Sequence, residues 1–170
     1  MPVPAIPTPI EEQAHYWIFE PVTDGLWGLT LDAFRQALLR REPTEFSHVW
    51  DHPGHGRRNG LTMSFGITLD QRAVEGVAGV AGEGAAIRNA TAAQAAEFGS
   101  WLAREVVPVR AALRISSREG IDFDVPDVLA TACTEAELRE LLLGHIRRID
   151  ESAWRVINRR SVPDPRLRYW

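Results

Sequence analysis

The sequence contains no lysine and a single cysteine, Cys133, among its 170 residues. One cysteine excludes an internal disulfide and gives no sign of an oxidising compartment. All 19 basic residues are arginines, and with abundant alanine, glycine and valine this indicates a GC-rich bacterial source rather than a function. The net charge of −4 argues against a sequence-independent nucleic-acid binder, which needs a basic surface.

Long apolar runs are also absent from the sequence. No stretch approaches the roughly 20 apolar residues that span a bilayer. Residues 1–10, MPVPAIPTPI, lack the basic and apolar regions of a secretory signal. We therefore expect a protein that binds no membrane and stays in the cytoplasm. The length and the 45% apolar content suit a single domain, which we place at 11–160, between an extended proline-rich arm (1–10) and an irregular tail (161–170).

The clearest structural signal is the alternating run LTMSFGITL at 61–69. Its odd positions are apolar and its even positions are Thr, Ser or Gly, which is typical of a strand with one buried face. The turn at 70–72 is short enough for a hairpin, and the glycine-rich return strand indicates that something packs close to its backbone.

Further patterns predict the other elements. Capping boxes at Thr91–Gln94 and Thr134–Glu137 each begin a helix. The buried stripe expected on the second helix consists of Leu138, Leu141, Leu142, His145 and Ile149. We interpret His145 as a core or boundary residue. Strands are expected near 15–20, 46–50, 61–69, 73–80, 85–89, 110–116 and 121–125, and helices near 31–40, 92–106 and 135–158. This order predicts an α+β fold, with a mainly antiparallel sheet of about five to seven strands and two or three helices packed on one face.

Candidate chemistry is concentrated in the run from His48 to His55, at the end of the predicted strand at 46–50 and in the loop after it. His48, His52 and His55 are potential metal ligands, and Asp51, His52 and His55 are potential acid-base groups. The spacing matches no known zinc motif, and Pro53-Gly54 makes the segment a turn. A solvated polar loop is the competing interpretation, and we expect no cofactor.

The polar face of the sheet is the second candidate. Asp122 and Asp124 would point to one side of a strand, roughly 7 Å apart, and could act on a glycoside or supply charge to a partner. We predict a binding surface on this face or on the neighbouring loop. Its residues are Thr62, Ser64, Thr68, Arg114, Asp122, Asp124, Trp50, Arg57 and Arg58.

Two functions follow from these patterns. The first is a non-catalytic protein-binding domain from a GC-rich bacterium, for example an immunity or antitoxin-type inhibitor of a partner protein, because such a protein needs an acidic complementary surface and no chemistry. The alternative is a small metal-dependent hydrolase or acid-base enzyme that uses the His48/His52/His55 loop. A homodimer through a tryptophan-bearing surface or a free sheet edge is compatible with both.

Overall fold

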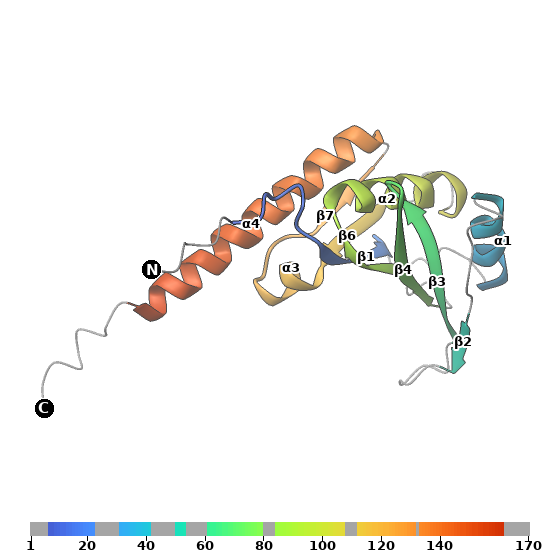
Figure 1. The fold of residues 1–170 in the computed structure, drawn as a ribbon, viewed down its shortest axis with the longest axis horizontal. Helices are drawn as coiled ribbons and strands as arrows, with labels where there is room; N and C mark the ends of the chain where they lie inside the picture. Colours follow the sequence, from blue (N-terminus) through green and yellow to red (C-terminus); the bar gives the residue numbers. More distant parts are fainter. Residues whose placement is uncertain are drawn as a thin grey trace, which may run out of the picture.

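The fold is α+β, as the sequence predicts, and consists of one antiparallel sheet with helices packed against it (Figure 1). The computed structural model describes residues 7–22, 31–41, 50–53, 61–79, 84–107, 112–131 and 133–161. The strands are β1 (His15–Pro21), β2 (Trp50–Pro53), β3 (Leu61–Leu69), β4 (Arg72–Gly79), β5 (Gly84–Ala90), β6 (Leu113–Ser117) and β7 (Val128–Ala130). The helices are α1 (Leu31–Arg41), α2 (Ala92–Glu105), α3 (Arg118–Asp122) and α4 (Glu135–Ser161).

The first strand of the chain lies inside the sheet rather than at its edge. The seven strands follow the order β2-β3-β4-β5-β1-β6-β7, so β1 separates β5 from β6. Trp17 pairs with Ile87 of β5 on one side and with Ser117 of β6 on the other. The short strands β2 and β7 form the two edges.

The alternation in β3 has the predicted outcome. Met63, Phe65, Ile67 and Leu69 are buried, whereas the intervening residues of the strand from Thr62 to Thr68 are half-exposed. Burial of each large side chain contributes roughly 1.5–3 kcal/mol. The helices supply the other side of the core, and every described large apolar residue of this strand faces them.

Aromatic rings join the sheet to its helices. The Phe65 ring lies 5.3 Å from that of Phe34 in α1 and 5.9 Å from that of Phe98 in α2, measured between centroids. Phe65 also covers Gly76 on the neighbouring strand, where a Cβ atom would lie 2.3 Å from the ring. The predicted close approach to the return strand is therefore confirmed.

Local sequence signals also predicted the hairpin turn between β3 and β4 and the starts of α2 and α4. Asp70 and Gln71 have φ values of 46° and 59°, which is the left-handed backbone of a tight hairpin turn. The Thr91–Gln94 capping box begins α2. The second box is also present: the Thr134 N–H donates to the Glu137 carboxylate at 2.7 Å, and the Glu137 N–H donates to the Thr134 hydroxyl at 3.2 Å.

The strand predicted at 121–125 is wrong. Residues Arg118–Asp122 form helix α3, and the Ser117 hydroxyl caps it by accepting the Gly120 N–H at 2.9 Å. Asp124 follows in a turn with a φ of 54°, and the chain returns to the sheet only at Val128. A side-chain cap and one helical turn outweigh a short apolar alternation.

Helix α4 is the longest element and packs beside α2 on the same face of the sheet. Leu138, Leu142, His145 and Ile149 are buried, as predicted, but Leu141 is 43% exposed and does not belong to the buried stripe. The helix continues to Ser161, and its second half extends beyond the sheet (Figure 1).

Candidate functional site

One face of the sheet is covered by helices, and the opposite face is the first candidate surface. Phe34 of α1, Phe98 of α2 and Leu138 of α4 all belong to the core on the helix side. Within the described residues, the even-numbered positions of β3 are not part of the core that the helices form with the sheet. Thr62, Ser64 and Thr68 are half-exposed on this uncovered face.

Strand register places Arg114 on the same face as the β3 residues. Successive pairs across the sheet connect Ser64 of β3 to Ser116 of β6 through Val77, Ala86 and Ile18. Since directly paired residues point to the same side, Ser64 and Ser116 lie on one face. Arg114, two positions before Ser116 in β6, shares that face, four strand spacings or about 19 Å from β3.

Two carboxylates that the sequence analysis missed neutralise Arg114. Its Nη2 donates to Glu20 Oε2 at 2.8 Å, and its Nε lies 3.7 Å from Asp127 Oδ2. All three side chains are 35–41% exposed. Glu20 alternates with buried Phe19 in β1, so the face on which Glu20 lies could be predicted from the sequence. The pairing of β1 with β6 could not. These two residues occupy the place beside Arg114 that we predicted for Asp122 and Asp124.

Asp122 and Asp124 are exposed but do not join this face. Asp122 ends α3 and Asp124 lies in the following turn, so the predicted pair of carboxylates on one strand does not form. Because this strand does not exist, the two carboxylates are not held on one strand face, and the glycosidase interpretation has no geometric basis.

The histidine loop lies mostly outside the described residues. His48, His55, Arg57 and Arg58 belong to undescribed segments. Trp50, Asp51 and His52 lie in β2, where Asp51 pairs with Met63 and His52 with Thr62, and their side chains are outside the described set. The loop therefore begins later than predicted, because its first residues extend the sheet.

A buried polar cluster is the second candidate. Ser117 and His145 are both fully buried, with 3.0 Å between Ser117 Oγ and His145 Nε2. His145 Nδ1 lies 3.1 Å from the Pro126 carbonyl oxygen, which can only accept a hydrogen bond. Nδ1 therefore carries the proton, and Nε2 accepts from the Ser117 hydroxyl. Desolvation by burial lowers the pKa of His145 from its usual 6.5.

His15 and Trp17 extend this cluster along β1. The Trp17 ring lies 5.6 Å from that of His15 and 5.9 Å from that of His145, measured between centroids. His15 Nδ1 lies 3.4 Å from Glu119 Oε2, which brings α3 against the start of β1. The cluster thus joins β1, β6, α3 and α4.

A serine beside a neutral histidine has the composition of a nucleophile and its base, but here the two side chains have a structural role. Substrate cannot reach Ser117, because the side chain is fully buried. Its oxygen is already engaged by the Gly120 N–H. A carbonyl, rather than a carboxylate, orients His145, and burial of the ring, which disfavours the imidazolium, outweighs the favourable effects of that carbonyl and of Asp127 on its pKa. The residues hold α3 against α4.

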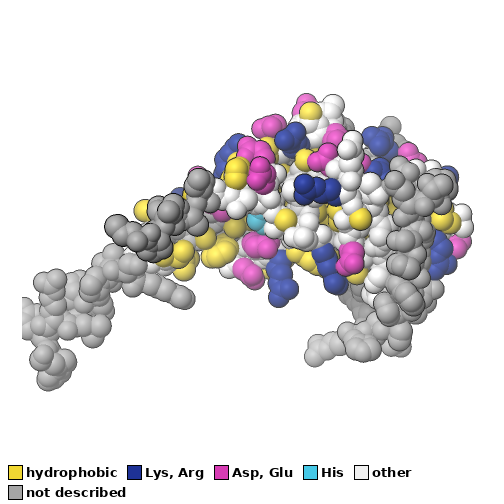
Figure 2. Space-filling model, in the orientation of Figure 1, with side chains coloured by type: hydrophobic (Ala, Val, Ile, Leu, Met, Phe, Trp, Pro, Cys, Tyr) yellow, Lys and Arg dark blue, Asp and Glu magenta, His cyan; other side chains and the backbone are white. Residues whose placement is uncertain are grey.

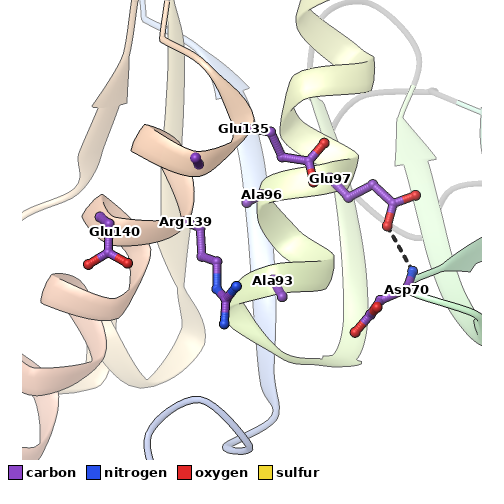
Figure 3. Close-up of a pocket in the computed structure, with 8 residues that line it drawn as sticks. Asp70, Ala93, Ala96, Glu97, Glu135, Arg139 and Glu140 are labelled. Carbon is purple, nitrogen blue, oxygen red and sulfur yellow. Dashed lines mark hydrogen bonds between the residues drawn. The ribbon is translucent and has the colours of Figure 1, made fainter.

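The groove between α2 and α4 is a third feature. It has a volume of about 560 Å³. Figure 3 shows Glu97 on α2 and Arg139 on α4 on its two sides, and the Asp70 N–H donates to Glu97 Oε2 at 2.7 Å. Glu97 also pairs with Arg41 of α1. Glu97 therefore links the β3–β4 turn to two helices, and its carboxylate is occupied by these contacts.

Metal and thiol chemistry find no support among these residues. No group of three or more His, Cys, Asp or Glu side chains is placed to hold a metal ion within the described ranges. Partial burial raises the pKa of the Cys133 thiol and so disfavours the reactive thiolate. None of the described helices has the length and apolar character needed to cross a membrane.

Comparison with known proteins gives no family. No protein-family model, curated protein or solved structure matches the chain. Its function is therefore argued from its own side chains and surfaces.

Proposed function

We propose that this chain is a non-catalytic protein-binding domain that recognises its partner with the uncovered face of the sheet. The observation that carries the proposal is the β3 part of this face: Thr62, Ser64 and Thr68 are small, uncharged and half-exposed. Small side chains leave a flat floor that another protein can approach closely. Strand pairing places the exposed Glu75 beside this floor, opposite Gly66, and its carboxylate adds negative charge to the face.

The Glu20–Arg114–Asp127 group supplies specificity at one end of the floor. Its two carboxylates exceed its single guanidinium by one negative charge. A partner that presents an arginine or lysine at this end would complete the charge balance, and charge complementarity directs specificity and association rate more than affinity. The chain's net charge of −4 acts in the same direction.

Inhibition of the partner is the function that best suits this chemistry. An immunity or antitoxin-type inhibitor covers a basic surface of another protein and needs no reactive group of its own. The groups with catalytic composition in the described part of the chain, Ser117 and His145, are buried and serve the fold.

Affinity capture from the native host, followed by binding measurements with the purified partner, tests the proposal. Ser64→Arg places a long cation in the centre of the floor and should weaken binding at least tenfold. Ala103→Arg, on an exposed position of α2, is the matched control and should leave affinity unchanged. Equal affinity of the two variants would remove this face from consideration, and an unaltered activity of the bound partner would exclude inhibition.

A further inference from the structure

His15, at the start of β1, is a buried histidine whose ring is not held by hydrogen bonds. Its side chain is 8% exposed, and among the described residues neither Nδ1 nor Nε2 has a hydrogen-bond partner. On the face of the molecule seen in Figure 2, only a small area of histidine surface is visible. A buried polar group without a partner costs free energy, so its retention in a folded protein calls for an explanation.

The carboxylate of Glu119 lies opposite this ring. Glu119 Oε2 is 3.4 Å from His15 Nδ1. This oxygen is shielded from solvent and, within the described part of the chain, accepts no hydrogen bond. The Glu119 side chain as a whole is 40% exposed. The two groups therefore face each other at ion-pair distance, and because Glu119 belongs to α3, their contact joins α3 to β1.

Protonation of His15 changes the nature of this contact. The neutral imidazole has one N–H, whereas the imidazolium has an N–H on each nitrogen and a positive charge. That charge would lie beside Glu119 Oε2, and its attraction to the carboxylate offsets the cost of burying the imidazolium. Histidine is the side chain that ordinarily changes its charge between about pH 5 and pH 8.

The charged groups around His15 come from several elements. They are Glu119, Arg118 and Asp122 of α3, Arg148 of α4, Asp127 before β7, and Glu11 and Glu12 before β1. Of these side chains, Glu119 forms an ion pair with His15. Across the sheet, His15 pairs with the uncharged Ala90 of β5.

The second histidine of the cluster is arranged to stay neutral. Both ring nitrogens of His145 are engaged in hydrogen bonds that the neutral ring can make, and burial lowers its pKa. Arg148 and a charged His15 lower this pKa further, whereas Asp127 raises it. The geometry therefore favours a proton on the ring that faces a carboxylate.

We propose that His15 and Glu119 form a pH-sensitive switch, in which protonated His15 holds α3 against β1 and neutral His15 holds it less tightly. The ion pair exists only in the protonated form, so the contact is strongest at low pH and weakens as the pH rises. The Ser117–His145 hydrogen bond that anchors α3 to α4 needs a neutral His145, so it responds to pH in the opposite direction. The switch does not depend on the binding function proposed above and goes beyond it.

Hydrogen exchange of backbone amides, measured by NMR, tests the switch. The N–H groups of Phe123 and Val125 donate to carbonyl oxygens of α3 at 3.0 and 2.8 Å, so their exchange reports the opening of α3. The Val106 N–H, which donates to a carbonyl oxygen of α2 at 3.0 Å, corrects for the effect of pH on exchange chemistry. Relative to Val106, protection of the two α3 amides should rise about threefold to fivefold from about pH 7.5 to about pH 5.5. A native chain that shows no such rise would overturn the proposal.

Variants of single side chains identify the groups responsible. Glu119→Gln keeps the size of the side chain and removes its charge, so the rise should disappear. Asp122→Asn removes the same charge from the other end of α3 and is the matched control, which should keep the rise. His145→Gln should also keep it, because His145 is not the group that takes up the proton. A rise that survives Glu119→Gln, or one that His145→Gln abolishes, would show that the His15–Glu119 pair is not the switch.

Discussion

Replacement of Gly120 by alanine tests the buried Ser117–His145 hydrogen bond. An added Cβ would lie 2.5 Å from His145 Nε2 and 3.0 Å from Ser117 Oγ. The imidazole cannot turn away easily, because its Nδ1–H is held by the Pro126 carbonyl and the ring is fully buried. We expect the substitution to separate α3 from α4 and to break the hydrogen bond.

The expected cost follows from two effects. Overpacking of a buried site costs about 1–3 kcal/mol. A buried hydroxyl or imidazole left without its partner costs about 1–3 kcal/mol more. The better helix propensity of alanine returns at most about 1 kcal/mol. With central values of about 2 kcal/mol for each cost and about 1 kcal/mol for the gain, the free energy of unfolding of Gly120→Ala should fall by about 3 kcal/mol.

Urea denaturation followed by circular dichroism measures the effect. With an m-value of about 2 kcal/mol/M, the midpoint should fall by about 1–2 M. Gly144→Ala is the matched control: a Cβ at Gly144, inside α4, meets nothing within 4 Å, and the variant should gain about 0.5–1 kcal/mol.

A double variant separates the ring contact from other causes. In a His145→Ala background, the atoms that the new Cβ would meet first are gone, so Gly120→Ala should cost less than about 1 kcal/mol. If the cost is the same in both backgrounds, the contact between Gly120 and His145 is not what requires glycine, and the reasoning is refuted.

Three further predictions concern single side chains. Because burial keeps the pKa of His145 lower in the folded than in the unfolded chain, the unfolded chain binds the extra proton. The contribution of neutral His145 to the free energy of unfolding is complete above about pH 6.5. It is lost as the pH falls, by at most about 1.4 kcal/mol per pH unit. Urea titrations at pH 7 and pH 5 should show this slope reduced in His145→Gln, and an unchanged slope would contradict it. Thr134→Ala removes the cap of α4 and should lower stability by about 1 kcal/mol at pH 7, whereas Thr134→Ser should retain most of it. Glu97→Gln weakens the contacts to Arg41 and to the Asp70 N–H, and should lower stability by about 1 kcal/mol. The loss should shrink in 1 M NaCl, and a salt-independent loss would point to packing.

Local patterns predicted the elements whose signals are local. The nine-residue alternation of β3 predicted both its strand and its buried face, because a strand's side-chain period is fixed by backbone geometry. Both capping boxes predicted helix starts to within a residue, because cap and partner lie three positions apart.

The failure at 121–125 has a local and a long-range part. Ile121, Phe123 and Val125 alternate with two aspartates, yet Ile121 is exposed and only Val125 is buried. The Ser117 cap of α3 is local, but the fit of Gly120 against His145 from α4 is a contact that no pattern within the segment reveals. The same limit applies to the candidate site: the side on which Arg114 lies was predictable, but its partners Glu20 and Asp127 depend on strand order.

The position of β1 has a consequence for the order of folding. Glu20 is 94 positions from its partner Arg114, and Trp17 donates its indole hydrogen bond to the carbonyl oxygen of Ala90, 73 positions away. Of the described strands, β1 leaves the ribosome first, and it has no neighbour until β5 has been synthesised. Pairings this distant slow folding. Once β5 has been synthesised, β1 can add to the β3–β4–β5 meander, but the other edge of β1 stays open until β6 follows, and a nascent chain paused there is the species most exposed to association with another strand.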